Sequence, residues 1–186
     1  MSRFSFSEKK TTQLAAAFIE RSGGSLNHMK LIKLMYMADR AALLRWERPI
    51  TGDDYFSLRH GPILSATLTM ISDGQDPSCE RFWSEYIEKS GSYEVSLLKP
   101  CPPNDLSQAE ENVIGEIFDK YGHYDKWELV KHLHEVLPEW KNPGNSSFPI
   151  DIESILKYEG WSEQEISDMD AELESVNAAK DLFGYR

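Results

Sequence analysis

The sequence predicts a mainly α-helical (α+β) fold: a compact helical domain with a short β-hairpin and an acidic C-terminal helix. Three observations support this class. Several segments repeat apolar residues at helical spacing behind a Ser or Asn cap. One segment, around Ser90-Gly91, alternates polar and apolar residues as hairpins do. The residues after Ser162 combine an apolar stripe with a face rich in acids.

Two helices are predicted in the N-terminal part of the chain. The first runs from its N-cap Ser7 to Arg21 and ends at Gly23-Gly24. The second begins after the cap Asn27 and runs to about Trp46. Apolar residues cover most of its circumference, which is typical of a buried helix. Because an unpaired charge is costly to bury, its charged side chains are expected to meet solvent or a partner. They are Lys30, Lys33, Asp39 and Arg40.

The stretch LRHGPIL, residues 58–64, places two basic side chains directly before a Gly-Pro pair. Residues 55–58 are predicted to be a short extended segment. Gly61-Pro62 is predicted to begin a helix that stops at Gly74, since Pro fits the first helical turn. We interpret the stretch as a structural corner in which Arg59 bonds backbone carbonyls or an acid such as Asp39. There His60 would satisfy a buried donor or acceptor. An exposed recognition corner is the alternative.

A β-hairpin is predicted near residues 82–99, and a Pro-rich loop follows it. Ser107, with Glu110 at the capping-box position, begins a third long helix that ends at Gly122. Another helix is predicted from Asp125 to Trp140, before Pro143-Gly144.

The stretch NPGNSSFP, residues 142–149, has the composition of a linker. We therefore divide the chain into a helical domain, residues 1–143, and a C-terminal helical extension, residues 144–186. The extension contains a short helix near Ile152–Tyr158 and a longer one from Ser162. The longer helix either docks on its own core or serves as a partner-binding arm. Its acidic face comprises Glu163, Glu165, Asp168, Asp170, Glu172 and Glu174.

The chain has 186 residues and a formal net charge of −11, unevenly distributed. Residues 1–62 carry ten basic and six acidic side chains, whereas the remainder carries ten basic and 25 acidic ones. The acidic remainder argues against nucleic acid as the partner and favours a basic protein. The excess of basic residues in 1–62 leaves one alternative open, an autoregulatory DNA-binding protein.

The expected location is the cytoplasm. No apolar run approaches the roughly 20 residues that span a bilayer. The first residues have no apolar core or cleavage site of a secretory signal. Cys79 and Cys101 stand in no CxxC pattern, so that free thiols are the simple interpretation.

Catalytic and metal-binding motifs give no positive signal. His132 and His134 lie near Glu128, but residues two apart on a helix point in different directions, and neither HExxH nor a Cys cluster occurs. There is no GxSxG, P-loop or GxGxxG motif. We therefore predict no metal, no cofactor and no enzymatic activity. The alternative is a small hydrolase-like enzyme that uses His60, His134 and nearby acids.

Three blocks, MKLIKLMYMADRAALL, PITGDDYFSLRHGPIL and ELVKHLHEVLPEW, occur in order between about residues 29 and 140. In this order and spacing they resemble the Panacea-domain (SocA-like) antitoxin family. Two departures are Leu133, where the family usually has Thr, and Glu139, which separates the Pro from the Trp. The matching residues are Lys30, Leu31, Lys33, Leu34 and Tyr36, then Gly61 and Pro62, then Glu128, Leu129, His134, Pro138 and Trp140.

The resemblance implies a helical fold with small β elements and no known catalytic activity. It implies that the protein binds and neutralises a cognate toxin encoded beside it, a setting found in prophages and phage defence. Some members also act as proteolytic adaptors, which adds a cytoplasmic AAA+ protease as a partner. A homo-oligomer is left open.

Two sets of residues are expected to matter for this function. Toxin contacts are predicted at solvent-facing charges of the second helix and the corner after it. They are Lys30, Lys33, Asp39, Arg40, Arg59 and His60. Fold-determining roles are predicted for Tyr36, Gly61, Pro62, Glu128, Leu129, His134 and Trp140.

Overall fold

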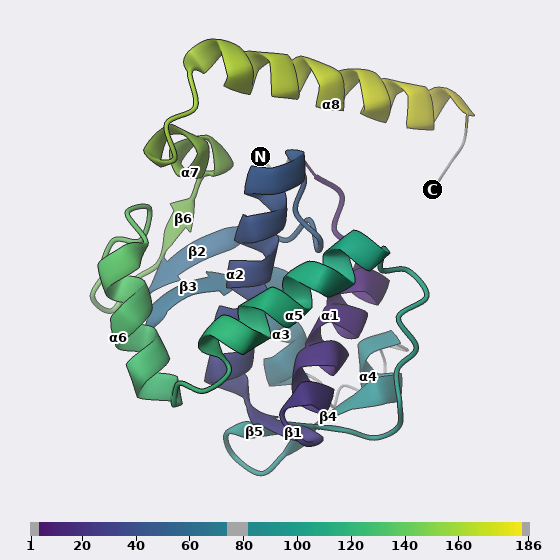
Figure 1. Cartoon of the computed structure of the whole chain (residues 1–186), viewed down its shortest axis with the longest axis vertical. Helices are drawn as coiled ribbons and strands as arrows, with labels where there is room; N and C mark the ends of the chain where they lie inside the picture. Colours follow the sequence, from purple (N-terminus) through teal and green to yellow (C-terminus); the bar gives the residue numbers. More distant parts are fainter. Residues whose placement is uncertain (1–3, 74–81, 184–186) are drawn as a thin grey trace.

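Helix α2 (His28–Trp46) is the centre of the fold (Figure 1). In the computed structural model, which describes residues 4–73 and 82–183, α2 packs against neighbours on several sides. These are α1 (Glu8–Arg21), α5 (Gln108–Tyr121), α6 (Lys126–Val136) and strand β3 (Gly61–Leu64). Every residue from 31 to 40 is buried, as the apolar circumference predicts. The mainly α-helical (α+β) class is confirmed.

Local cap chemistry sets the starts of the long helices. The Ser7 hydroxyl accepts from the Lys10 N–H at the start of α1, and Asn27 accepts from Met29 at the start of α2. Ser107 and Glu110 form the predicted capping box of α5. These predicted starts are confirmed.

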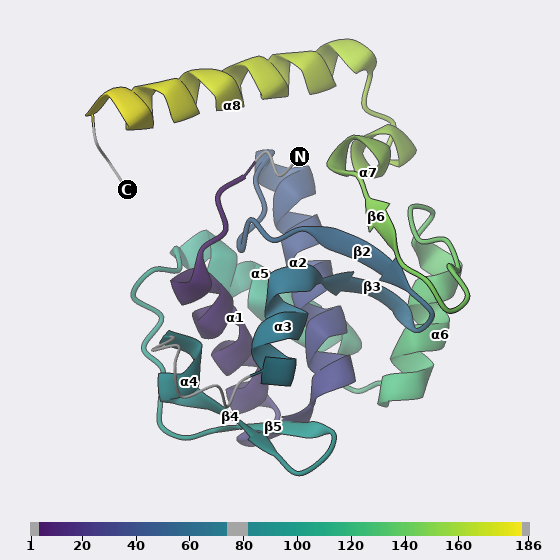
Figure 2. The same ribbon diagram turned by 180° about the vertical axis from the view of Figure 1, so that it is seen from behind.

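Two small antiparallel sheets flank the helices (Figure 2). One has the order β1-β5-β4, with β1 at Ser25–Asn27, β5 at Glu94–Leu97 and β4 at Ile87–Ser90. The other has the order β3-β2-β6, with β2 at Tyr55–Leu58 and β6 at Phe148–Ile150. Strands β1 and β6 were not predicted, because short strands are specified by their pairing partners more than by their own residues.

The prediction that Gly61-Pro62 begins a helix is wrong. Residues Gly61–Leu64 form β3, which pairs with β2 around the Arg59-His60 turn, and helix α3 (Ser65–Asp73) starts after it. Gly61 has φ +100°, outside the helical region. Pro62 is tolerated because β3 is an edge strand. The predicted helix end at Gly74 lies outside the described residues, as does Cys79.

Two further boundaries differ from prediction. The hairpin is shorter than residues 82–99, because Phe82–Tyr86 forms a helical segment, α4, that packs against α1 and buries Trp83. Helix α6 ends at Val136 and not at Trp140. Leu137 is extended there because the following Pro138 disfavours a helical conformation in the residue before it.

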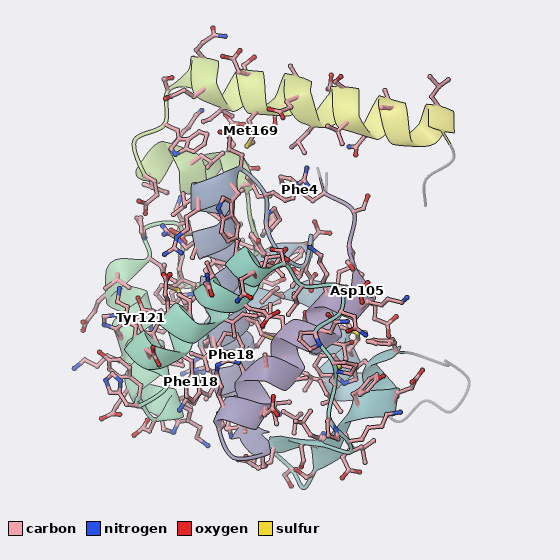
Figure 3. All side chains as sticks on the ribbon, turned by 45° about the vertical axis from the view of Figure 1, so that its right-hand side comes forward. Phe4, Phe18, Asp105, Phe118, Tyr121 and Met169 are labelled. Carbon is pink, nitrogen blue, oxygen red and sulfur yellow. The ribbon has the colours of Figure 1, made fainter. Side chains whose placement is uncertain are left out.

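The chain after β6 forms α7 (Ile152–Tyr158) and α8 (Glu163–Phe183). Helix α8 crosses one end of the molecule beyond α7 (Figure 1). In Figure 3, Met169 lies on the side of α8 that faces the body, where it is 2% exposed. The division of the chain at residue 143 stays a prediction. Strand β6 lies beyond that point and pairs with β2.

No helix in the described part of the chain has the length and apolar character needed to cross a bilayer.

Candidate functional site

Three of the charges on α2 face inward. Lys33, Asp39 and Arg40 are 1%, 0% and 8% exposed. The expectation that they face solvent is therefore wrong. The reason is that each finds polar partners inside the fold, which offsets the cost of burial.

Arg40 belongs to a buried ionic network. It donates from Nε to Glu139 Oε1 at 2.7 Å and from Nη2 to Glu159 Oε1 at 2.6 Å. The Tyr36 hydroxyl donates to the same Glu139 oxygen at 2.8 Å. Burial by itself would lower the pKa of Arg40, but the hydrogen bonds to Glu139 and Glu159 outweigh it and raise that pKa. The network ties α2 to the chain after α6 and after α7.

Sequence reasoning missed Glu139 and Glu159 as partners of this network. Tyr36 and Arg40 stand four residues apart on a largely apolar helix, and so share one face. That spacing indicates a buried acid facing them, although it does not reveal the acid's position in the chain.

Asp39 stabilises the turn that follows α2. Its carboxylate accepts from the backbone N–H groups of Ile50 and Thr51, both at 3.0 Å, and from the hydroxyls of Thr51 and Tyr55. Burial raises the pKa of Asp39 to about 7, against these hydrogen bonds. The predicted Arg59–Asp39 pair does not form, since Arg59 is exposed in the β2–β3 turn.

Lys33 extends from α2 to the Gly-Pro pair. Its Nζ donates to the Pro62 carbonyl at 2.6 Å, and burial lowers the pKa of this amine to about 7. A Cβ at position 61 would lie 3.1 Å from Lys33 Cε and 3.7 Å from His134 Nε2. Gly61 is therefore required both by its positive φ and by close packing.

His134 and Trp140 also pack against the β2–β3 hairpin. Their rings stack with centroids 3.6 Å apart and planes 5° from parallel. Trp140 Nε1 donates to the Leu58 carbonyl at 2.9 Å. His134 Nε2 has no hydrogen-bond partner among the described residues. Burial, followed by the charges of Lys33 and His60, lowers the pKa of His134.

The remaining predicted residues lie around Lys33 and the hairpin or on α6. Lys30 is half-buried and donates to the Gly122 carbonyl at 2.7 Å. Glu128 completes the capping box of α6, and Leu129 is fully buried. His60 is exposed and contacts the Trp127 ring edge-on, with centroids 5.3 Å apart.

A cavity of about 390 Å³ opens beside Lys33 and the β2–β3 turn. Its walls come from the first turns of α2, the β2–β3 hairpin, α3 and residues 144–146. Apolar walls are supplied by Met29, Ile32, Leu58, Ile63 and Leu68. Its basic side chains are those of His28, Lys33, Arg59 and His60. A hollow of this size and lining is typical of a ligand-binding site.

Helix α8 presents a different surface. Ile166 and Met169 are buried and Leu173 packs against the core, whereas Leu182 is 79% exposed. The acids Glu163, Glu165, Asp168, Glu172 and Glu174 are exposed. An amphipathic helix with this distribution can hold to its own body at one end and offer acids to solvent along the other face.

Comparison with known proteins identifies the family. The family model for antitoxins of the SocA-like type with a Panacea domain matches residues 31–141, which is more than half of the chain. No curated protein and no solved structure gave a significant match. The matched region contains most of α2, the β2–β3 hairpin, the Gly-Pro pair and the His134–Trp140 stack. On this match, the chain belongs to the SocA-like, Panacea-domain antitoxin family.

Proposed function

We propose that this protein neutralises a cognate protein toxin by binding it directly, and that the acidic face of α8 is one contacting surface. The family match supports an antitoxin role. The observation that favours direct binding is α8 itself, whose first turns are held to the body by Ile166 and Met169 while most of its acids stay exposed.

Electrostatics gives α8 its expected partner. The chain carries a net charge of −11, and the exposed acids of α8 add to a long negative face. A negative face attracts a basic partner and raises the association rate, with an effect that salt screens. The toxin surface that meets α8 is therefore expected to be rich in Lys and Arg.

The β2–β3 turn is proposed as a second contact region. Of the six predicted contacts, Arg59 and His60 are exposed there, and Lys30 is half-buried. Lys33, Asp39 and Arg40 are buried, and we assign them an indirect role, in which they hold the hairpin and the turn after α2 in shape. Their buried positions leave little side-chain surface for a partner.

Delivery of the toxin to a cytoplasmic AAA+ protease is a finer proposal that rests on the resemblance to the family alone. It predicts that purified toxin is degraded faster when this chain is added to the protease. Direct neutralisation instead predicts loss of toxicity without degradation, so that the two are separated by measuring toxin level and growth together.

The experiment that tests the proposal is co-expression of the tagged chain with each small adjacent open reading frame. A stoichiometric complex with a growth inhibitor, together with rescued growth, is the expected result. Failure with every neighbour would shift weight to the enzyme or DNA-binding alternatives. A folded His60→Ala variant that still neutralises the toxin would count against the enzyme alternative.

The contribution of α8 is tested by the triple variant Asp168→Asn, Glu172→Gln and Glu174→Gln. The matched control is Glu20→Gln, Glu88→Gln and Glu135→Gln, which removes the same charge from exposed acids on other elements. The α8 variant is expected to associate more slowly with the toxin than the control does. Equal rates would remove α8 from the interface.

A further inference from the structure

The cavity beside the Gly-Pro pair is lined by basic and apolar side chains and, among the described residues, by no acid, in a chain whose net charge is −11. Its basic side chains are those of His28, Lys33, Arg59 and His60. Burial lowers the pKa of Lys33 to about 7, so that Arg59 supplies the lasting positive charge. A basic lining without acids inside an apolar hollow favours an anionic occupant.

The N-terminus of α2 adds to the positive potential. The cavity reaches this end of a 19-residue helix with no acid in its first turn, where the helix dipole is positive. Burial lowers the pKa of His28 at this end, so that its imidazole adds no lasting charge.

The charged groups are arranged at two depths. Lys33 is 1% exposed and holds the floor next to Pro62, whereas Arg59 and His60 are exposed at the β2–β3 turn. Arg59 forms no ion pair with any described residue. Between floor and rim the walls are apolar, for example at Ile32 and Leu68.

We propose that this cavity binds a small organic anion, with an apolar body against the α2 and α3 walls and a single negatively charged head group among the basic side chains. Such a ligand matches the lining in both respects. The volume of about 390 Å³ lies in the range of small-molecule sites. This inference goes beyond the proposed function and does not require that the protein bind a toxin.

A fluorescent pair of probes tests the chemistry directly on the full chain. The anion 8-anilinonaphthalene-1-sulfonate and the uncharged N-phenyl-1-naphthylamine share an apolar body and differ in the sulfonate. The anion is expected to bind one per chain and about fivefold more tightly than the neutral dye, since a partly shielded charge pair contributes about 1 kcal/mol. Equal affinities would overturn the proposal, because the cavity would then not select an anion.

The site is located by substitutions at its rim and wall. Arg59→Glu is expected to weaken the anionic dye about tenfold and to leave the neutral dye unchanged. Lys131→Glu, the same charge change at an exposed position on α6, is the matched control and is expected to have no effect. Leu68→Trp fills the cavity and is expected to exclude both dyes. Equal behaviour of the Arg59 and Lys131 variants would place the dye elsewhere and overturn the proposal.

A last arm separates a free ligand from a group supplied by the toxin. Once the complex with the toxin is in hand, the anionic dye is titrated into it. Unchanged binding supports a free small anion and would remove Arg59 and His60 from the toxin interface. Loss of binding in the complex would overturn the assignment to a free ligand, because the toxin would then cover or occupy the cavity.

Discussion

Helices α2 and α8 both carry many charged side chains, but they use them in opposite ways. In α2, Lys33, Asp39 and Arg40 are buried and each is hydrogen-bonded to a group distant in sequence. In α8, most of the acids are exposed, and the contacts of Glu165 and Asp168 are with residues in the same stretch of chain.

The difference separates charges that stabilise the fold from charges available to a partner. A buried charge loses its hydration and depends on its partners, so that removing one partner is costly. An exposed charge keeps its hydration and contributes little to stability. Charge reversal on α2 should therefore unfold the protein, and charge removal on α8 should alter encounter with a partner.

The largest effect is expected for Glu139→Gln. It leaves the buried Arg40 without its main partner and weakens the bond from Tyr36, at a cost of about 3 to 5 kcal/mol in the free energy of unfolding. Urea denaturation measures the loss.

The control for this substitution is Glu116→Gln, which breaks the exposed pair with Arg45. It is expected to cost far less than Glu139→Gln, because both charges of this pair keep their hydration. If the two variants lost the same stability, the buried network would stabilise the fold no more than an exposed ion pair does. The proposed difference between α2 and α8 would then be wrong.

The contribution of Lys33 to the free energy of unfolding is expected to depend on pH. Burial lowers its pKa from 10.5 to about 7 in the folded protein. Between these values the unfolded chain binds a proton that the folded protein does not, so that the contribution of this residue to stability rises with pH. From pH 7 to pH 9, the free energy of unfolding of the wild type should rise by about 2 kcal/mol relative to Lys33→Met.

Urea titrations at the two pH values check this expectation. His134, whose pKa is lowered from 6.5, is already neutral in this window and does not obscure it. Lys131→Met, at an exposed position, should follow the wild type. A Lys33→Met variant with the same pH dependence as the wild type would show that Lys33 is hydrated in solution.

The separation along the chain between interacting residues explains which features the sequence could predict. The starts of α1, α2 and α5 were predictable because a cap such as Ser7, Asn27 or Ser107 acts within three residues of itself. The buried network could not be predicted, because Arg40 binds Glu139 and Glu159, which lie 99 and 119 residues further along the chain. A pattern within one helix indicates that a partner is needed and leaves its position open.

Contacts with residues distant in sequence also account for the wrong prediction at the Gly-Pro pair. Pro in a first helical turn is a sound local rule, yet Gly61 to Leu64 are all buried and pair with β2. Lys33 binds this strand at Pro62, His134 lies close to Gly61, and Trp140 binds the neighbouring strand at Leu58. Tertiary packing therefore outweighed the local preference. The family motif placed these residues together without revealing their geometry.

A smaller effect separates packing from backbone conformation at Gly61. Gly61 and Gly91 both have positive φ, +100° and +76°, but a Cβ at Gly91 would meet nothing within 4 Å. Gly91→Ala should cost about 1 kcal/mol for the backbone alone. Gly61→Ala should cost about 1 kcal/mol more, since it must displace Lys33. Thermal or urea unfolding of the pair measures the difference, and equal losses would mean that Lys33 moves aside freely.

The smallest effect on stability is expected for Asp168→Asn, Glu172→Gln and Glu174→Gln together on α8. All three acids are exposed, so that the free energy of unfolding should change by less than about 0.5 kcal/mol. The rate of association with a basic toxin should nevertheless fall, and the fall should shrink as salt is added, because steering acts over the range that salt screens. Stopped-flow mixing at low and high salt measures both. A large loss of stability with unchanged association would place α8 with α2 among the elements that stabilise the fold. Slower association at unchanged stability would instead mean that the charges of this helix act in binding a partner and do not stabilise the fold.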